Sequence, residues 1–205
     1  MASMKLCTSL AVLVVAGFVA GCGGGESAGE QTTDPQQAFL QSMVPHHNSA
    51  VDMAKVAETE GQSAFVKDLA SEITRTQTEE VGRMEEIHQR LFNAPLKPDM
   101  GAHMALGLSA QEAGMNHMDG AKMIRGKQPF DRAFVDEMIP HHQGATRMAE
   151  AVLPKTRDRQ LRSLAEGIIA AQKREIAEMQ RFREREFAQL APVALASARR
   201  ARPAR

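Results

Sequence analysis

Imidazole and thioether side chains recur in two copies of one short motif, and both groups bind transition metals in proteins. In each copy, a methionine precedes an apolar residue, a proline and two adjacent histidines. The motif residues are Met43, His46 and His47 in the first copy, and Met138, His141 and His142 in the second. Adjacent residues on a helix point about 100° apart, so one histidine of each pair can face inward while its neighbour reaches the boundary or another helix.

Each histidine pair is followed by a helical stripe with polar residues where a packed helix normally has leucine. The stripe reads Ile, Gln, Glu and Met, spaced by four, three and four residues. Its carboxylates are Glu80 and Glu175, and its methionines are Met84 and Met179. A buried carboxylate without a partner costs on the order of several kcal/mol, so it normally pairs or binds metal. We therefore expect both carboxylates to face the core together with His46 and His141 and their neighbouring histidines.

The repeated His–Glu–Met set has two interpretations. In the first, a histidine and a glutamate from facing helices coordinate a metal ion, flanked by methionines. These are Met43, Met84, Met138 and Met179, with Met148 on the histidine stripe of the second copy. In the second, a hydrogen-bonded His–Glu network stabilises the core, and the methionines only fill gaps in the packing. The sequence leaves both open.

The segment between the two copies is also rich in these side chains. It contains Met100, His103, Met104, Met115, His117, Met118 and Met123. Thioether and imidazole without thiolate suit copper, especially Cu(I), although another transition metal is possible. We take His117 and Met118 as candidate ligands. The alternative is that these methionines pack the segment onto the rest of the fold.

The chain repeats itself at an offset of 95 residues, and the periodicity is helical throughout. Apolar residues from Phe39 and from Phe134 step by four and three, and the stripe continues through Pro45 and Pro140 without a change of phase, which favours kinked continuous helices. We predict second helices over residues 64–92 and 158–191. The predicted fold is all-α: an antiparallel four-helix bundle over residues 36–191, with repeats 36–92 and 131–191. A linker, residues 93–130, contains one or two short helices, and residues 192–205 form a basic, disordered tail.

The N-terminus has the pattern of an export signal. An apolar run of about 11 residues, too short to span a bilayer, follows Lys5 and ends at Val19-Ala20-Gly21-Cys22, which resembles a bacterial lipobox. We expect residues 1–21 to be removed, Cys22 to carry lipid, and residues 22–35 to form a flexible tether. The protein would then be anchored to a membrane on its extracytoplasmic side, at the cell surface or in the periplasm. An ordinary secretory signal is the alternative.

Composition and missing motifs exclude several functions. The 205 residues carry 25 basic and 25 acidic side chains and no Trp or Tyr, which argues against nucleic-acid binding. Nucleophilic catalysis has no support, because Gly-x-Ser-x-Gly is absent and both cysteines lie in or beside the export signal. A di-metal oxidase normally uses Glu-x-x-His, which neither histidine pair has. We therefore expect a copper-binding protein rather than an enzyme, with a structural bundle as the alternative; assembly into a homo-oligomer is possible.

The second copy, with its Met-Ile-Pro-His-His-Gln-Gly-Ala run from Met138 and its Gln-Lys-Arg-Glu-Ile-Ala-Glu-Met run to Met179, resembles the domain of unknown function 305 family. The resemblance covers roughly residues 36 to 188 and implies a ferritin-like, extracytoplasmic four-helix bundle, with copper handling in some members. Carried over by position, it marks Met138, His141, His142, Met148, Glu175 and Met179. The first copy departs from the pattern at Val44 and at Asn48-Ser49, which stand where the second has Ile139 and Gln143-Gly144.

Overall fold

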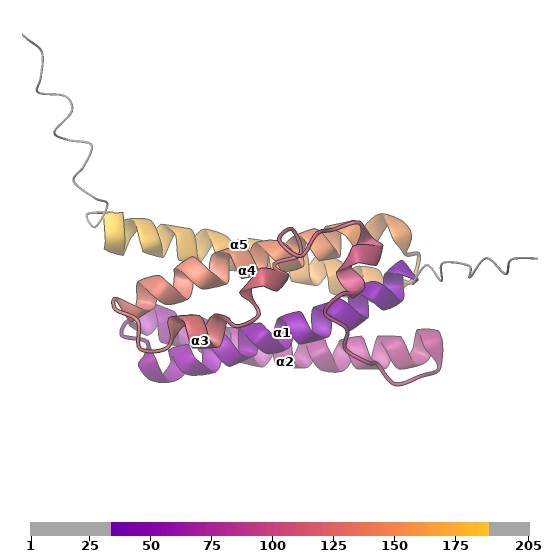
Figure 1. Cartoon of the computed structure of the whole chain (residues 1–205), viewed down its shortest axis with the longest axis horizontal. Helices are drawn as coiled ribbons and strands as arrows, with labels where there is room; N and C mark the ends of the chain where they lie inside the picture. The colour runs from indigo at the N-terminus through magenta and orange to yellow at the C-terminus, as the bar shows by residue number, and fades with distance from the viewer. Residues whose placement is uncertain (1–33, 189–205) are drawn as a thin grey trace, which may run out of the picture. The chain divides into compact units, whose positions relative to one another are not determined.

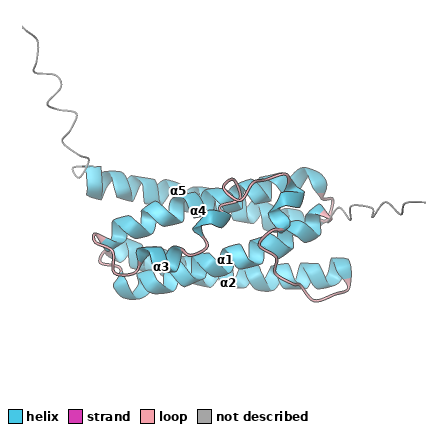
Figure 2. Cartoon of the chain, viewed as in Figure 1, coloured by secondary structure: helices cyan, strands magenta, loops and turns pink. Residues whose placement is uncertain are grey.

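The computed structural model describes residues 34–188, and this part of the chain is helical with no strand (Figure 2). The α-helices are α1 (Pro35–Glu60), α2 (Ala64–Phe92), α3 (Gly120–Ile124), α4 (Phe130–Val152) and α5 (Arg159–Phe187). Three 3₁₀ segments are η1 (Ala102–Leu106), η2 (Met115–His117) and η3 (Leu153–Lys155). The predicted signal, Cys22, almost all of the tether and the basic tail lie outside the described residues.

Each sequence repeat folds as one helical hairpin (Figure 1). α1 packs along α2, α4 packs along α5, and the hairpins meet through α1 against α4 and α2 against α5. Ser42, in the first half of α1, contacts Met148, near the end of α4, and the second half of α1 shares a core cluster with the first half of α4. These two helices therefore run in opposite directions. The duplication in sequence is therefore a duplication of structure.

Local capping residues set the bounds of the second helices. The Ser63 side chain accepts a hydrogen bond from the N–H of Val66 to begin α2, which ends at Asn93 in the left-handed conformation with φ 49°. Asp158 caps α5 in the same way through the N–H of Leu161. α2 matches the predicted residues 64–92. α5 ends at Phe187, four residues before the predicted end, and residues 189–191 lie outside the described part.

The two prolines lie inside their helices, as predicted: α1 continues through Pro45 and α4 through Pro140. Proline lacks the N–H that would bond the carbonyl four residues earlier. In α1 that carbonyl belongs to Gln41, and it accepts a hydrogen bond from the N–H of Asp99 at 2.9 Å. Pro45 thus frees the backbone acceptor that fixes the linker to α1.

The linker explains why the two copies differ after their histidines. It contains three short helical pieces, η1, η2 and α3, where the sequence predicted one or two. A Cβ built on Gly144 would collide with the backbone of Ala113 and Gly114, so only glycine fits where the linker crosses α4. At the matching position of α1, the Ser49 hydroxyl donates a hydrogen bond to the carbonyl of Met118 at 2.9 Å.

The apolar core consists of two clusters of buried side chains, and the histidine pairs lie between them along the helices. One cluster includes residues 39–44 of α1 and residues 145–152 of α4; the other includes residues 50–57 of α1 and residues 130–139 of α4. The paired histidines occupy positions 46–47 and 141–142, where one cluster gives way to the other. A polar layer therefore divides the core.

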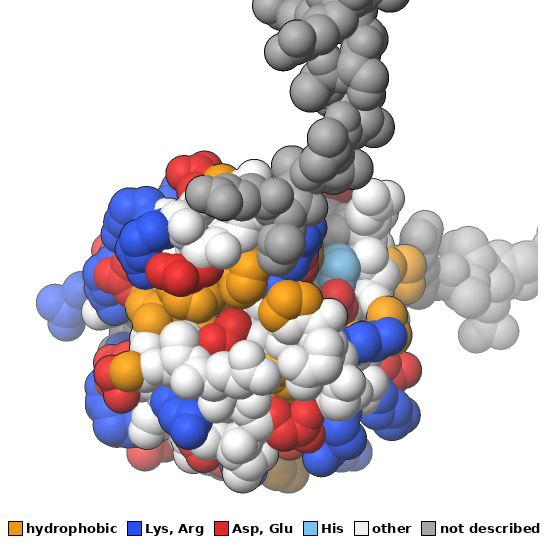
Figure 3. Space-filling model, turned by 90° about the vertical axis from the view of Figure 1, so that its left-hand side faces the viewer, with side chains coloured by type: hydrophobic (Ala, Val, Ile, Leu, Met, Phe, Trp, Pro, Cys, Tyr) orange, Lys and Arg blue, Asp and Glu red, His pale blue; other side chains and the backbone are white. Residues whose placement is uncertain are grey.

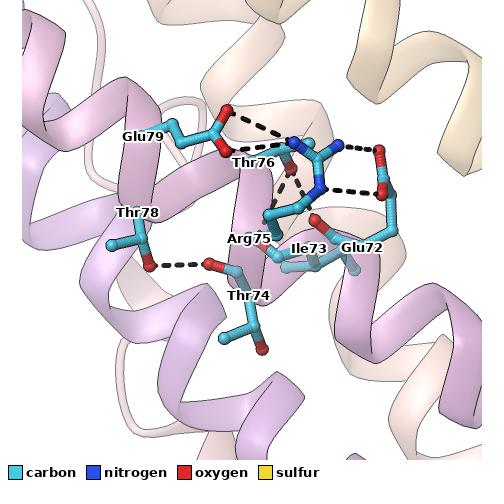
Figure 4. Close-up of polar contacts among 7 residues, drawn as sticks. All are labelled: Glu72, Ile73, Thr74, Arg75, Thr76, Thr78 and Glu79. Atoms are coloured by element: carbon cyan, nitrogen blue, oxygen red, sulfur yellow. Dashed lines mark hydrogen bonds and ion pairs between the residues drawn. The ribbon is translucent and has the colours of Figure 1, made fainter.

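The outer surface of the protein carries exposed ion pairs of the kind common on helix surfaces, in contrast to the buried polar layer. On α2 the exposed Arg75 donates to Glu72 and Glu79 (Figure 4). Acidic and basic side chains also intermingle at the end of the molecule shown in Figure 3, with apolar side chains between them. Such exposed pairs contribute little to stability. In the described part of the chain, no helix combines the length and the apolar character needed to cross a bilayer.

Candidate metal centre

The two hairpins meet at a contact between His46 of α1 and His141 of α4. Both rings are fully buried, their centroids are 3.8 Å apart, and their planes are tilted by 41°. Neither nitrogen of either ring has a hydrogen-bond partner among the described residues. Buried polar atoms are normally paired, because leaving one unpaired costs about 1–3 kcal/mol. Within the described part of the chain, this contact therefore contains four buried ring nitrogens without the hydrogen-bond partners that buried polar atoms normally have.

Burial keeps both rings uncharged. The pKa of His46 lies well below its ordinary value because burial penalises the protonated ring. Positive charge on the neighbouring His47, His142 or His117 would lower this pKa further, and the backbone of His141 has a smaller effect that raises it. Burial likewise lowers the pKa of His141, followed by the effect of His46. Neutral imidazole is the form that binds metal, so the fold presents both rings ready to coordinate.

The second histidine of each pair is held by the glutamate of its own hairpin. His47 Nε2 lies 2.9 Å from a carboxylate oxygen of Glu80, and His142 Nε2 lies 2.7 Å from that of Glu175. The two copies thus make the same contact despite their sequence departures. The expectation that a histidine and a glutamate meet from facing helices is confirmed. The glutamates bond His47 and His142, the neighbouring histidines named in that expectation, and His46 and His141 have no hydrogen-bond partner among the described residues.

These carboxylate contacts decide which ring nitrogen remains available. A carboxylate only accepts hydrogen bonds, so in the neutral ring Nε2 carries the proton and Nδ1 keeps its lone pair. Nδ1 of His47 and Nδ1 of His142 are both buried and have no partner in the described residues. A carboxylate that orients a histidine in this way is a common second layer around protein metal sites.

Two glutamines add to the unpaired polar atoms of this layer. Both amide atoms of Gln77 and the amide oxygen of Gln172 are buried with no hydrogen-bond partner in the part of the chain described. They precede Glu80 and Glu175 by one helical turn. The sequence marked them as polar residues on an apolar stripe but did not assign them a role. Their orphaned atoms show that the layer as a whole is short of hydrogen-bond partners.

Buried methionines flank the histidines in two matching groups. Met43, Met84 and Met148 belong to the first core cluster, and Met53, Met138 and Met179 belong to the second. All six are fully buried. Met53 was not among the predicted ligands, although the offset of 95 that relates it to Met148 could have identified it. Each group combines methionines from both hairpins, so thioethers are available on both sides of the histidine layer.

The linker contributes a partly exposed histidine. His117 Nδ1 lies 2.7 Å from Oε1 of Glu137, and both side chains are about one-fifth exposed. Glu137 follows no motif and could not be predicted from the sequence. Met118 packs, partly buried, against the first core cluster. Residue 114 of the same linker lies beside His46, because a Cβ on Gly114 would approach Nε2 of that ring to 3.1 Å.

The candidate metal-donor atoms lie in one layer of the core, but they do not form one coordination sphere. Among the described residues, no three His, Cys, Asp or Glu side chains are arranged so that they could hold a metal ion. A coordination sphere in this layer must therefore use methionine sulfur, a small rotation of the rings, or both. Imidazole nitrogen with thioether sulfur is a donor set that suits copper and suits oxygen-preferring ions poorly.

Comparisons with known proteins identify similar structures and the family of the chain. Two similar solved structures are of CopM: a silver-bound form (31% identity, TM-score 0.61, covering 74% of this chain and 97% of CopM) and a Cu(I)-bound form (30%, 0.61, 73% and 96%). A third is a DUF305 fragment from Deinococcus radiodurans (29% identity, TM-score 0.60, covering 75% and 97%). A search of curated proteins found no match. The sequence profile described as "Domain of unknown function (DUF305)" matches residues 36–183, and the chain therefore belongs to the DUF305 family.

Proposed function

We propose that this protein binds copper in the layer of histidines between its two core clusters. The observation that carries the proposal is the contact of His46 with His141, in which four buried ring nitrogens have no partner among the described residues. A bound ion would compensate those nitrogens. The proposed ligands are His46, His47, His141 and His142, with sulfur from Met43, Met84, Met138, Met148 and Met179, and His117 with Met118 on the linker side.

In this proposal, Glu80 positions His47, Glu175 positions His142, and neither carboxylate binds the ion. Their carboxylates already accept from His47 and His142 at hydrogen-bond distance. The soft donor set favours Cu(I). That CopM has been crystallised with Cu(I), Cu(II) and silver supports a copper-handling role at the level of the family.

In the proposed role, the protein binds its ion in order to sequester it or pass it on, and it does not act as an enzyme. Its four long helices would form a ferritin-like antiparallel four-helix bundle, which fits the pairwise packing of α1, α2, α4 and α5. We further propose that lipid on Cys22 anchors it at the extracytoplasmic face of a membrane. The lipobox-like sequence before Cys22 supports that anchor.

Titration of the purified, metal-free protein with Cu(I), against a coloured chelator and without oxygen, tests the core of the proposal. We expect a dissociation constant well below about 10 μM, and a loss of at least about tenfold in His46→Gln with His141→Gln. His88→Gln is the matched control, because His88 is also buried but bonds the carbonyl of Ala94 through Nδ1, away from the layer. Affinity weaker than about 10 μM would refute the proposal.

A purely structural role is the second candidate, and the paired His47–Glu80 and His142–Glu175 contacts favour it specifically. The two candidates differ in how stability responds to metal. An ion that binds only the folded protein raises the melting temperature as its free concentration exceeds the dissociation constant. A melting temperature that is unchanged by copper, zinc and nickel would favour the structural role over metal binding.

A further inference from the structure

The exposed large apolar side chains of the described residues are three methionines, all from the linker. Met100, Met104 and Met123 are exposed to 50%, 69% and 58%. The alternative that linker methionines pack onto the bundle holds for Met115, which is buried, and for Met118, which is partly buried, but not for these three. Side chains that stand in solvent add little packing energy, so burial of apolar surface does not explain why thioethers occupy these positions.

Two of the three flank a histidine in the sequence. Met100 lies in the turn directly before η1, and His103 and Met104 lie near the start of η1. His103 Nδ1 lies 2.9 Å from the carbonyl of Met100, which only accepts, so Nδ1 carries the proton and Nε2 keeps its lone pair. The ring is largely buried, at 5% exposed, but its Nε2 has no protein partner in the described part of the chain and is not among the fully enclosed polar atoms.

The side chain of Met104 folds back over this turn. A Cβ built on Gly101 would lie 3.7 Å from the Cε methyl of Met104, which places the thioether of Met104 next to the residue that follows Met100. The N–H of Ala102 bonds the carbonyl of Asp99, so Met100 lies in a tight turn that leads directly into η1, and His103 reaches back to the carbonyl of Met100. Two thioethers and one imidazole therefore belong to five consecutive residues of folded backbone.

The turn is anchored rather than loose. Asp99 bonds the free carbonyl of Gln41 through its N–H, and its side chain accepts from the N–H of Gly101 at 2.8 Å. On the other side, Leu106 is buried in the first core cluster, and its carbonyl accepts from Lys155 Nζ at 2.8 Å. Fixed ends lower the entropy that a ligand must overcome when it orders the donors between them.

We propose that Met100, His103 and Met104 form a second, surface site for a soft univalent ion, Cu(I) or Ag(I). Two thioethers and a neutral imidazole suit such an ion and suit hard cations poorly. The site takes its class of ion from the proposed function, but it lies outside the histidine layer. Its two exposed thioethers fit it to take an ion directly from solution.

Silver added to the metal-free, full-length protein, carrying ¹³C-methyl methionine, tests this site by NMR. Ag(I) binds soft donors as Cu(I) does and needs no reductant. We expect the methyl signals of Met100 and Met104 to shift together during the first additions. The variant Met100→Leu with Met104→Leu should bind about one ion fewer per chain, because leucine keeps the bulk and removes the sulfur.

Met123→Leu is the matched control, because Met123 is equally exposed on the same linker and shares no turn with a histidine. It should bind as much silver as the unchanged protein. An equal loss in this control, or unmoved Met100 and Met104 signals, would overturn the proposal.

The same spectra separate this site from the core. Movement of the Met100 and Met104 signals without that of the buried Met43 would leave the surface site standing and count against the histidine layer. Movement of Met43 alone would do the reverse.

Discussion

Acid should destabilise the metal-free protein through the His46–His141 contact. Unfolded, each ring has an ordinary pKa of about 6.5. Folded, burial holds the pKa of both rings well below that value. Between the two pKa values the unfolded chain therefore binds more protons than the folded one, so the free energy of unfolding falls as pH is lowered through about 6.5 and continues to fall until the folded rings are protonated.

The size of the effect follows from the number of rings. Lowering the pH from 7.5 to 5.5 protonates each ring almost fully in the unfolded state and leaves it neutral in the fold. That difference lowers the free energy of unfolding by about 1.4 kcal/mol for each ring, and by about 2.7 kcal/mol for the pair. A change of that size corresponds to a fall in melting temperature of roughly 5–10 °C for a protein of this length.

Urea denaturation of chelator-treated protein at a series of pH values measures the effect. The variant His46→Gln with His141→Gln supplies the reference, because every other titrating group is unchanged and the difference in slope belongs to the pair. Should this variant fail to fold, NMR of the labelled histidine rings replaces it: neither buried ring should titrate between pH 7.5 and 5.5. Two rings that titrate near 6.5, or equal slopes in variant and parent, would refute the reasoning.

Two further predictions concern the linker crossing and the histidine–carboxylate pairs. Gly144→Ala should lower the free energy of unfolding by about 1–3 kcal/mol, because its Cβ would meet the linker backbone. Gly167→Ala has open space around it and should raise the free energy of unfolding by about 0.5–1 kcal/mol. Urea denaturation measures both, and a stabilising Gly144→Ala would contradict the close approach. Glu175→Gln should weaken Cu(I) binding about 10–100-fold in a chelator competition, because His142 loses the carboxylate that orients it, and the exposed Glu166→Gln should leave it unchanged. Equal affinities in the two variants would remove Glu175 from the site.

The sequence predicted the elements that carry a repeated period and little of what lies between them. The offset of 95 and the spacing by four and three placed the long helices, and they brought Glu80 and Glu175 to histidines of a facing helix. They could not decide which histidine each glutamate meets, because neighbours on a helix differ by about 100° and the choice depends on how the helices rotate against each other.

The linker was beyond sequence reasoning because it has no period. Its path depends on single tertiary contacts, such as the N–H of Asp99 on the carbonyl that Pro45 leaves free. Glu137, which bonds His117, follows no motif and was found only in the structure. Gly144 was visible in the sequence as a departure between the copies, but its cause is the close approach of the linker backbone to α4, whereas at the matching position of α1 there is room for the Ser49 side chain to bond the linker.

The meeting of one ring from each hairpin bears on how such a protein could arise. A single ancestral hairpin would carry one inward imidazole and would have needed a second copy of itself to complete the pair seen between His46 and His141. Joining two hairpins in one chain raises the local concentration of the partner to about the millimolar range. An ion held across that junction would link the two halves, so joining the hairpins in one chain would replace an encounter between two molecules with a contact within one.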